Sequence, residues 1–350
     1  MAKTKSEKDI AKIGEFGLIH LLTSKIKLKN SSSVMGVGDD AAVIDMTNKK
    51  TVVTTDLLTE GIHFDLMYTP LKHLGYKAVV VNLSDIYAMN AKPTQVLVSV
   101  AISAKFTTEM VKELYEGIHL ACEFYGVDLV GGDTSSSLTG LMLSITAIGE
   151  AQEEELVYRS GAQENDLLCV SGDLGAAYMG LQLLEREKQV FRQTGETQPD
   201  LSGNDYILER QLKPEARHDI IKQLKELQIK PTAMIDISDG LSSEILHICE
   251  SSNKGCRVYA DKIPIADETK QIVDEMGMEP ATVALNGGED YELLFTVPLE
   301  HYDKMITLPG VAVIGHINKK DEGKYLVNPD GSLIEIQAMG WDGLSDEEED

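Results

Sequence analysis

Residues 36–44 read GVGDDAAVI, and this stretch decides the fold that we predict, because two glycines are followed at once by the carboxylates of Asp39 and Asp40. The pattern G-x-G-x-x-A is typical of a dinucleotide-binding turn, and Asp56 lies near the position of a ribose-binding acid. Such a turn offers bare helix N–H groups to a pyrophosphate, which two carboxylates would repel unless a cation stood between them. The residues that follow also read as short strands instead of a helix. We therefore interpret the stretch as a metal-holding turn, with Asp40 as the better ligand candidate.

The composition fits a globular chain of two ordinary domains. Of the 350 residues, 43% are hydrophobic, which is enough to fill two cores. The 57 acidic against 32 basic residues give a formal charge of −25, which argues against nucleic acid or an anionic membrane as the main partner. A phosphorylated ligand must therefore bind together with cations. Residues 344–350 read LSDEEED, and we expect them to form an acidic, solvated tail.

The cysteines and the apolar runs favour a protein of the reducing cytoplasm. Neither a zinc site nor a disulfide framework is indicated, because the four cysteines contain no C-x-x-C pair. The lysines near the N-terminus precede no apolar segment, and no run reaches the ~18 apolar residues that a membrane span requires. We therefore expect a cytoplasmic protein with no membrane partner.

The pattern of apolar residues predicts an α+β organisation in two domains. An amphipathic helix at 7–28 is expected to lead into the first acidic turn. Residues 151–166 are polar and acidic, so we place the boundary there, with domains at 1–150 and 151–343. In the first domain we expect helices at 70–89 and 107–125 and strands at 51–56, 95–102, 127–130 and 141–149. In the second we expect strands at 167–171, 233–237, 255–260, 291–297 and 311–317, helices at 176–187, 215–227, 241–252 and 266–275, and an exposed polar insertion at 188–204.

Acidic and hydroxyl side chains recur in short motifs that we expect at strand ends or, in one case, in a helix. The motifs are Thr54-Thr55-Asp56, Asn82-Leu83-Ser84-Asp85 in the helix, Gly131-Gly132-Asp133-Thr134 and Ile235-Asp236-Ile237-Ser238-Asp239-Gly240. Mg²⁺ takes oxygen ligands and typically one or two protein carboxylates. Two carboxylates ~4 Å apart repel by about 4 kcal/mol at an effective dielectric of 20, so such clusters favour bound cations. We predict more than one Mg²⁺ ion, although each motif taken alone also suits a helix cap or an Asx turn.

Further features bear on a phosphorylated or cationic ligand. Arg159, near the domain boundary, either binds a phosphoryl oxygen or forms an ordinary surface ion pair. The run NGGEDYELL at 286–294 places Glu289 and Asp290 in a turn that either binds a cationic ligand or is capped by these acids. The only tryptophan, Trp341, either stacks on a heteroaromatic cation or pins the C-terminus to the core. The chain has neither a P-loop nor the protein-kinase motifs, so metal ions must neutralise the phosphates of any bound ATP.

In order and approximate spacing these motifs resemble the thiamine-monophosphate kinase family, over about residues 14–341. That family belongs to the aminoimidazole ribonucleotide synthetase-like superfamily, so the resemblance implies a two-domain mixed α/β fold in which helices cover mixed sheets. It implies that ATP donates its γ-phosphoryl directly to the phosphate of thiamine monophosphate, giving thiamine diphosphate and ADP, with Mg²⁺ and without a covalent intermediate. It also implies that the N-terminal domain binds ATP and Mg²⁺ and forms a homodimer. The insertion at 188–204, the acidic tail and the residues after Trp341 depart from the family pattern.

The resemblance also implies roles for individual residues. Asp56 and Asp239 are expected to be central to catalysis. Mg²⁺ ligands are expected at Asp40, Thr54, Thr55, Asp56, Asp85, Asp133, Asp236 and Asp239. Nucleotide contacts are expected at Tyr115, Gly132, Asp133, Arg159 and Ser238. The thiamine side of the site is expected at His63, Glu289 and Trp341, since a cationic thiazolium favours an acid and an aromatic face.

Two alternatives compete with this function. The first is another ATP-dependent synthetase of the same superfamily, although a selenophosphate synthetase would need a reactive cysteine near the N-terminus, whereas the first cysteine here is Cys122. The second is a non-catalytic protein that binds divalent cations. Such a protein would take up metal without turning over ATP, whereas the kinase forms ADP only when thiamine monophosphate is added.

Overall fold

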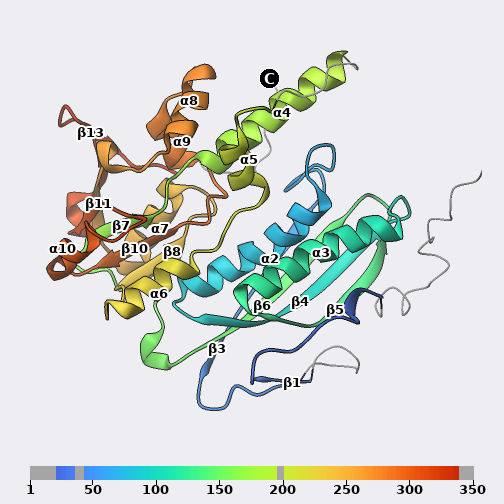
Figure 1. Cartoon of the computed structure of the whole chain (residues 1–350). Helices are drawn as coiled ribbons and strands as arrows, with labels where there is room; N and C mark the ends of the chain where they lie inside the picture. Colours follow the sequence, from blue (N-terminus) through green and yellow to red (C-terminus); the bar gives the residue numbers. More distant parts are fainter. Residues whose placement is uncertain (1–20, 36–42, 195–200, 339–350) are drawn as a thin grey trace, which may run out of the picture. The chain divides into compact units, whose positions relative to one another are not determined.

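The computed structural model describes residues 21–35, 43–194 and 201–338 of the chain (Figure 1). The chain divides into two compact units, Met1–Leu156 (unit 1) and Val157–Asp350 (unit 2). Within the described ranges, no helix is long and apolar enough to cross a membrane.

Unit 1 is built on a sheet that, in the described part of the chain, has four strands in the order β3-β6-β4-β5. Strand β6 pairs antiparallel with β3 and β4, whereas β5 pairs parallel with β4. The bounds are β3 (Lys50–Thr59), β4 (Lys92–Ser103), β5 (Asp128–Ser137) and β6 (Met142–Ala151), preceded by the short pair β1 (Ser33–Met35) and β2 (Val43–Ile44).

Two helices, α2 (Leu71–Ala88) and α3 (Thr108–Tyr125), cover one face of this sheet (Figure 1). Alternate residues of β6, among them Leu143 and Ile145, are buried on the covered face, while the residues between them are only partly buried. This period of two is that of a sheet with one face packed and one face open. The side chain of Thr107 caps α3 by accepting the N–H of Met110 at 3.2 Å, and Gly126 ends the helix in the left-handed region.

Unit 2 contains a larger mixed sheet whose seven strands, among the described residues, follow the order β13-β12-β9-β11-β7-β10-β8. Its neighbours pair antiparallel except β12 and β9, which are parallel. The strands are β7 (Leu167–Ser171), β8 (Ala233–Asp236), β9 (Gly255–Tyr259), β10 (Leu293–Val297), β11 (Val311–Asn318), β12 (Lys324–Val327) and β13 (Leu333–Glu335). The helices are α4 (Ala176–Thr194), α5 (Asp205–Leu212), α6 (His218–Glu226), α7 (Leu241–Ser252), α8 (Asp267–Glu275), α9 (Pro280–Asn286) and α10 (Tyr302–Met305).

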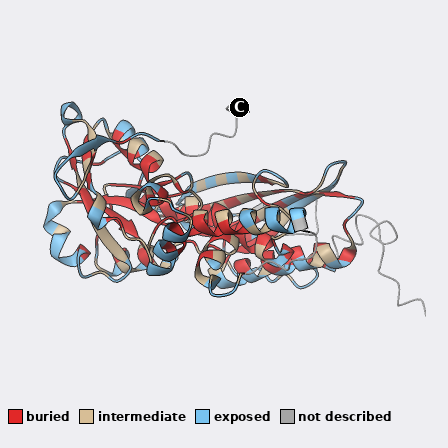
Figure 2. Cartoon of the chain, turned by 90° about the horizontal axis from the view of Figure 1, so that it is seen from above, coloured by how far each residue is buried: buried red, intermediate tan, exposed pale blue. Residues whose placement is uncertain are grey.

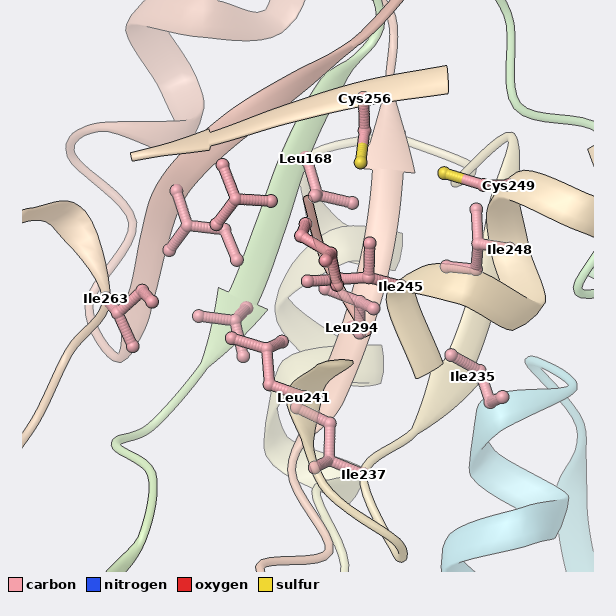
Figure 3. Close-up of a cluster of buried hydrophobic side chains, with 14 of the residues drawn as sticks. Leu168, Ile235, Ile237, Leu241, Ile245, Ile248, Cys249, Cys256, Ile263 and Leu294 are labelled. Atoms are coloured by element: carbon pink, nitrogen blue, oxygen red, sulfur yellow. The ribbon is translucent and has the colours of Figure 1, made fainter. Parts of the chain in front are cut away.

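The core of unit 2 lies between this sheet and α7 (Figure 3). Leu241 and Ile245 of α7 pack in one buried cluster with Leu168 of β7 and Leu294 of β10. A second buried cluster joins α4 to α5, α8 and α9 through residues such as Met179, Leu183, Ile207, Ile272 and Val283. Figure 2 shows the buried residues along the strands and along the sides of the helices that pack on them. These contacts fix α7, which follows the loop at 236–239, and α5, which carries Arg210 and Gln211.

Several predicted elements are found at nearly the predicted bounds. The helices predicted at 70–89 and 107–125 are α2 and α3, and the strands predicted at 167–171 and 233–237 are β7 and β8. The helix predicted at 7–28 begins outside the described residues. In the part of it that the structure describes, residues 21–23 are helical. The sequence prediction missed α5, α9, α10, β12 and β13.

Two acidic motifs do not lie where they were predicted. Thr54-Thr55-Asp56 was expected at a strand end but lies inside β3, because that strand continues its pairing with β6 as far as Thr59. Gly131-Gly132-Asp133-Thr134 was expected to form a turn but continues β5, because β4 offers a parallel partner along the whole stretch from Asp128 to Ser137. The helix predicted to end at 187 continues to Thr194, so the first part of the polar insertion predicted at 188–204 is helical, and residues 189–193 within it are exposed as predicted.

Close packing between α2 and α3 depends on Gly75 and Gly117. A Cβ atom at Gly75 would lie 2.0 Å from the carbonyl oxygen of Leu114, and one at Gly117 would lie 1.9 Å from that of Lys72. The two helix backbones therefore approach each other as closely as they do only because neither position carries a side chain.

We predict that Gly75→Ala destabilises unit 1 by about 1–3 kcal/mol, because a methyl group forced against backbone must push the helices apart. Denaturant unfolding followed by circular dichroism measures this change. Gly131→Ala is the control, since its Cβ would meet only Leu97 Cδ2, at 3.6 Å. Equal stability of the two variants would contradict the close approach.

Candidate active site

In unit 1, β3 and α2 bring three of the predicted metal ligands together. Residues 54 and 56 lie on the same face of β3, because side chains on a strand alternate. The hydroxyl of Thr54 donates to Asp85 Oδ2 at 2.6 Å, and the N–H of Asp56 donates to Asn82 Oδ1 at 3.1 Å. Asn82 and Asp85 are three residues apart on α2 and therefore share a helix face. The motif Asn82–Asp85 on α2 thus faces the motif Thr54–Asp56 on β3.

The electrostatics of this cluster suit a cation. Burial, together with the charge of Asp85, raises the pKa of Asp56 to about 6. Two carboxylates held near each other in a half-buried place repel, and a divalent cation relieves that repulsion. The donor set of carboxylates and a hydroxyl consists of the hard oxygen ligands that Mg²⁺ prefers. The residues present therefore fit the predicted ion.

The cluster is not a complete protein cage. Across the described ranges, no group of three or more His, Cys, Asp or Glu side chains is placed to hold a metal ion. An incomplete set is the usual case for Mg²⁺, which keeps waters and takes phosphate oxygens from a substrate. The predicted ligand Asp40 lies outside the described residues.

Two other predicted ligands lie on the opposite, open face of the same sheet. Thr55 is exposed there, and its hydroxyl donates to the carbonyl of Ile145 at 3.0 Å. Asp133 is exposed and pairs in register with Ser99 of β4, which is also exposed. Within unit 1 the structure therefore does not bring these two residues to Asp56. Gly132 precedes Asp133, and a Cβ there would lie 1.8 Å from the carbonyl of Val98.

The remaining predicted residues of unit 1 lie in different surroundings. Tyr115 is buried in α3, and burial raises the pKa of its hydroxyl to about 12. His63 lies in the loop after β3, and its Nδ1 accepts the N–H of Thr59 at 3.1 Å. This hydrogen bond fixes the orientation of the imidazole ring. The predicted contacts of Tyr115 with nucleotide and of His63 with thiamine stay predictions.

In unit 2, the loop between β8 and α7 carries Asp236, Ser238 and Asp239. Asp236 is buried at the end of β8, whereas Asp239 is exposed just before α7. Gly240, the N-cap residue of α7, provides no side-chain cap, and the N–H of Asp239 instead donates to Glu244 Oε1 at 3.1 Å. The helix start thus places acidic side chains around its N-terminal end.

The sequence prediction missed Glu244 as part of this loop. Its side chain is buried in the first turn of α7, and its Oε2 has no hydrogen-bond partner among the described residues. Burial, together with the charges of Asp239 and Asp236, raises the pKa of Glu244 to about 8. In the sequence Glu244 looked like an ordinary first-turn acid, and the only available signal was its place five residues after Asp239.

The run at 286–294 lies beside this loop. The N–H of Glu289 donates to the carbonyl of Ser238 at 2.8 Å, and the N–H of Tyr291 donates to that of Ile237 at 2.9 Å. The N–H of Ile237 donates in turn to the carbonyl of Glu292 at 2.7 Å. These three backbone hydrogen bonds join the predicted nucleotide residue Ser238 to the predicted thiamine residue Glu289.

The acids of this run differ in what they do. Asp290 is buried and caps α4, since it accepts the N–H groups of Gly175 at 2.8 Å and Ala177 at 3.4 Å. Burial raises its pKa to about 7. Asp290 therefore caps the start of α4 and not the turn that contains it, and the predicted ligand contact of Glu289 stays a prediction. Glu289 is only half-buried, and its carboxylate accepts a hydrogen bond from Gln211 Nε2 at 2.9 Å.

Two arginines that the sequence prediction did not single out neutralise Glu292. Arg210 Nη1 lies 2.9 Å from Glu292 Oε1, and Arg217 Nη1 contacts Oε2 of the same buried carboxylate. The hydroxyl of Ser171 also donates to Oε2, at 2.5 Å. No sequence signal could have found these pairs, because the arginines are 82 and 75 residues away from Glu292.

The last two predicted residues are less informative. Arg159 is exposed at the start of unit 2, and its carbonyl accepts a hydrogen bond from the Ser252 hydroxyl at 3.5 Å. Trp341 lies outside the described residues.

Comparison with known proteins covers both units. Residues 38–151 match the family model "AIR synthase related protein, N-terminal domain", and residues 163–328 match "AIR synthase related protein, C-terminal domain". The thiamine-monophosphate kinase of Aquifex aeolicus is 34% identical to this chain, over 95% of this chain and 98% of the relative. The thiamine-monophosphate kinase of Bacillus subtilis is 33% identical, over 93% of this chain and 98% of the relative.

Solved structures agree with these relatives. The structure described as "AaThiL complexed with AMPPCP and TMP" matches with a TM-score of 0.73 at 33% identity, over 95% of this chain and 97% of that chain. The hydrogenase maturation protein HypE in complex with ATP matches with a TM-score of 0.71 at 19% identity, which shows the shared fold alone. The two-domain fold predicted from the motifs is thereby confirmed, and the chain belongs to the thiamine-monophosphate kinase family.

Proposed function

We infer that this chain transfers the γ-phosphoryl group of ATP to the phosphate of thiamine monophosphate, which gives thiamine diphosphate and ADP. The observation that carries this inference is the near full-length similarity to thiamine-monophosphate kinases, one of which is described in complex with AMPPCP and TMP. The oxygen-rich clusters of both units agree with it, since the reacting groups are two phosphates that repel each other.

Charge neutralisation and positioning carry this reaction, and no side-chain nucleophile is required. Thr54, Asp56 and Asp85 would hold a Mg²⁺ ion in unit 1, and Asp236 and Asp239 would hold one in unit 2. A bound Mg²⁺ neutralises phosphate oxygens and bridges them to the protein. The chain's own contribution is to hold these oxygens in place through α2 and through the first turn of α7.

The proposal includes a cytoplasmic location. All four cysteines are free thiols buried in the structure. Buried free thiols are typical of proteins of a reducing compartment.

We predict that the protein forms ADP only when ATP, Mg²⁺ and thiamine monophosphate are all present, which a coupled assay for ADP measures. Asp56→Asn should lower kcat by on the order of 10²–10³, the usual effect of removing one group that stabilises developing charge. Asp45→Asn is the matched control, because Asp45 is an exposed acid of the same unit. ADP formation that does not depend on thiamine monophosphate would overturn the proposed function.

Mg²⁺ binding should depend on pH through Asp56. The pKa of Asp56 is raised to about 6, so the metal-free folded state binds its proton more tightly than the unfolded chain does. Its contribution to stability is therefore present below pH ~4 and is lost as the pH rises through 6, while Mg²⁺ binds the ionised form.

We therefore predict that saturating Mg²⁺ raises the Tm more at pH 7.5 than at pH 5. Thermal unfolding with and without Mg²⁺ at the two pH values measures the difference. Asp56→Asn should lose most of this dependence on pH, whereas Asp45→Asn should keep it. An equal Mg²⁺ effect at both pH values would show that Asp56 is not a ligand.

We also propose that unit 1 forms a homodimer through the open face of its sheet. Val53 and Leu57 of β3 are 59% and 56% exposed there, opposite the face that α2 and α3 cover. Partly buried Met142 and Ile148 of β6 share this face. Exposed apolar side chains gathered on one sheet face are typical of an interaction surface.

Val53→Glu combined with Leu57→Glu should therefore convert a dimer into a monomer, because two buried charges per chain would oppose association. Size-exclusion chromatography with light scattering measures the mass. Leu120→Glu, at an exposed position of α3, is the control. A wild-type chain that elutes as a monomer would contradict the proposed dimer.

A further inference from the structure

We propose that Glu244 is a positioning residue of the metal site in unit 2. One oxygen of its carboxylate fixes the loop that carries Asp239, and the other accepts a hydrogen bond from the hydration shell of the bound Mg²⁺. This inference rests on the proposed function, which places a Mg²⁺ ion at Asp236 and Asp239. It deepens that function by adding a residue that lies outside the motif at 235–240.

The first oxygen, Oε1, replaces a helix cap. Helix α7 follows Gly240, which adopts a φ of 122° and has no side chain that could cap the helix. The N–H of Asp239 instead donates to Glu244 Oε1 at 3.1 Å, back across the first turn. Hydrogen bonds to an ionised acceptor are stronger than those between neutral groups. This contact therefore ties the backbone of Asp239 to the helix that follows it.

The second oxygen, Oε2, has no comparable use within the chain. Glu244 is 1% exposed, and its Oε2 has no hydrogen-bond partner among the described residues. Two other buried acids of unit 2 have partners for both oxygens, since Asp290 caps the start of α4 and Glu292 faces two arginines. A buried polar atom without a partner costs free energy. Glu244 Oε2 therefore indicates a hydrogen-bond donor that comes from outside the chain.

The chemistry of the site identifies this donor. The charges of Asp236 and Asp239 act on Glu244, but no three acids in the described ranges are placed to bind one ion directly. Mg²⁺ keeps several waters when one or two carboxylates bind it. Those waters donate hydrogen bonds, whereas an ionised phosphate offers only acceptors. Outer carboxylates that accept from the groups around an ion typically contribute 10–100-fold to its affinity, and Glu244 Oε2 suits this role.

The test separates the two oxygens of Glu244. In Glu244→Gln the amide oxygen still accepts the N–H of Asp239, but the amide nitrogen cannot accept a hydrogen bond from water. The proteins compared carry Asp56→Asn, which removes a predicted ligand of unit 1, so that binding in unit 2 is measured. The probe is Mn²⁺ alone, which takes the same oxygen ligands as Mg²⁺. Electron paramagnetic resonance measures the free Mn²⁺.

We expect Glu244→Gln to raise the Kd for Mn²⁺ by about tenfold or more. Its Tm without metal should change by less than about 4 °C, because the contact with Asp239 is retained. Glu244→Met lacks both oxygens, so it should weaken Mn²⁺ binding at least as much and lower the Tm as well. Glu268→Gln is the matched control and should keep the Kd, because Glu268 is an exposed acid in the first turn of α8.

Each contrary outcome has a distinct meaning. If Glu244 only capped α7, Glu244→Gln would bind Mn²⁺ as tightly as its parent, and that result overturns the inference. A Tm that falls together with the Mn²⁺ affinity in Glu244→Gln does so too, as does an equal loss of affinity in Glu268→Gln. Absence of Mn²⁺ binding in the Asp56→Asn parent would leave no ion for Glu244 to position. The proposed function fails separately, if the wild-type protein forms no ADP with thiamine monophosphate, since the Mn²⁺ titration needs no substrate.

Discussion

A carboxylate that is buried or half-buried needs a counter-charge, and the acids of the candidate site differ in how each obtains one. Glu292 obtains it from within the chain, through Arg210 and Arg217. Asp56 lies near a second carboxylate, Asp85, and its raised pKa shows that repulsion and burial are not offset within unit 1. The first kind of acid stabilises a loop, whereas the second kind has the charge and the oxygen ligands that suit a bound cation.

The same distinction separates neighbours in one motif. Asp290 and Glu289 are adjacent, yet Asp290 is fully buried and caps α4 while Glu289 remains half-buried against an amide. Glu244 differs from both kinds, since burial and the charges of Asp239 and Asp236 raise its pKa to about 8, and its Oε2 has no hydrogen-bond partner in the described part of the chain. Because phosphoryl transfer between two anions needs positive charge at the reacting groups, acids that are not already neutralised within the chain are the better candidates for holding a metal ion.

The sequence was sufficient for the motifs, for a long and mostly apolar helix such as α2, and for an amphipathic helix such as α3. It was insufficient where tertiary pairing overrides local preference. Asp56 and Asp133 lie inside strands although aspartate disfavours strands, because β6 and β4 provide continuous partners for those stretches. Helix α5 was missed because it is short and follows a polar run, so Arg210 and Gln211 had no visible partner.

The alternation of side chains along a strand also limits what a linear motif can tell. Thr54, Thr55 and Asp56 look like one ligand set in the sequence, but the middle residue points to the open face of the sheet.

Backbone hydrogen bonds join the loop at 236–239 to the loop at 289–292 in unit 2. The first loop contains the predicted nucleotide residue Ser238, and the second contains the predicted thiamine residue Glu289. Ser238 and Glu289 share a 2.8 Å backbone hydrogen bond, and Ile237 forms backbone hydrogen bonds with Tyr291 and Glu292, the two residues that follow Asp290. In-line transfer requires donor and acceptor phosphates to be held in register, and an error of about 1 Å in placement can cost on the order of 10²-fold in rate. The two loops are joined by backbone hydrogen bonds, and α5 contacts them through Arg210 and Gln211, which meets that requirement. The predicted nucleotide residue Ser238 and the predicted thiamine residue Glu289 thereby belong to one shared structural element.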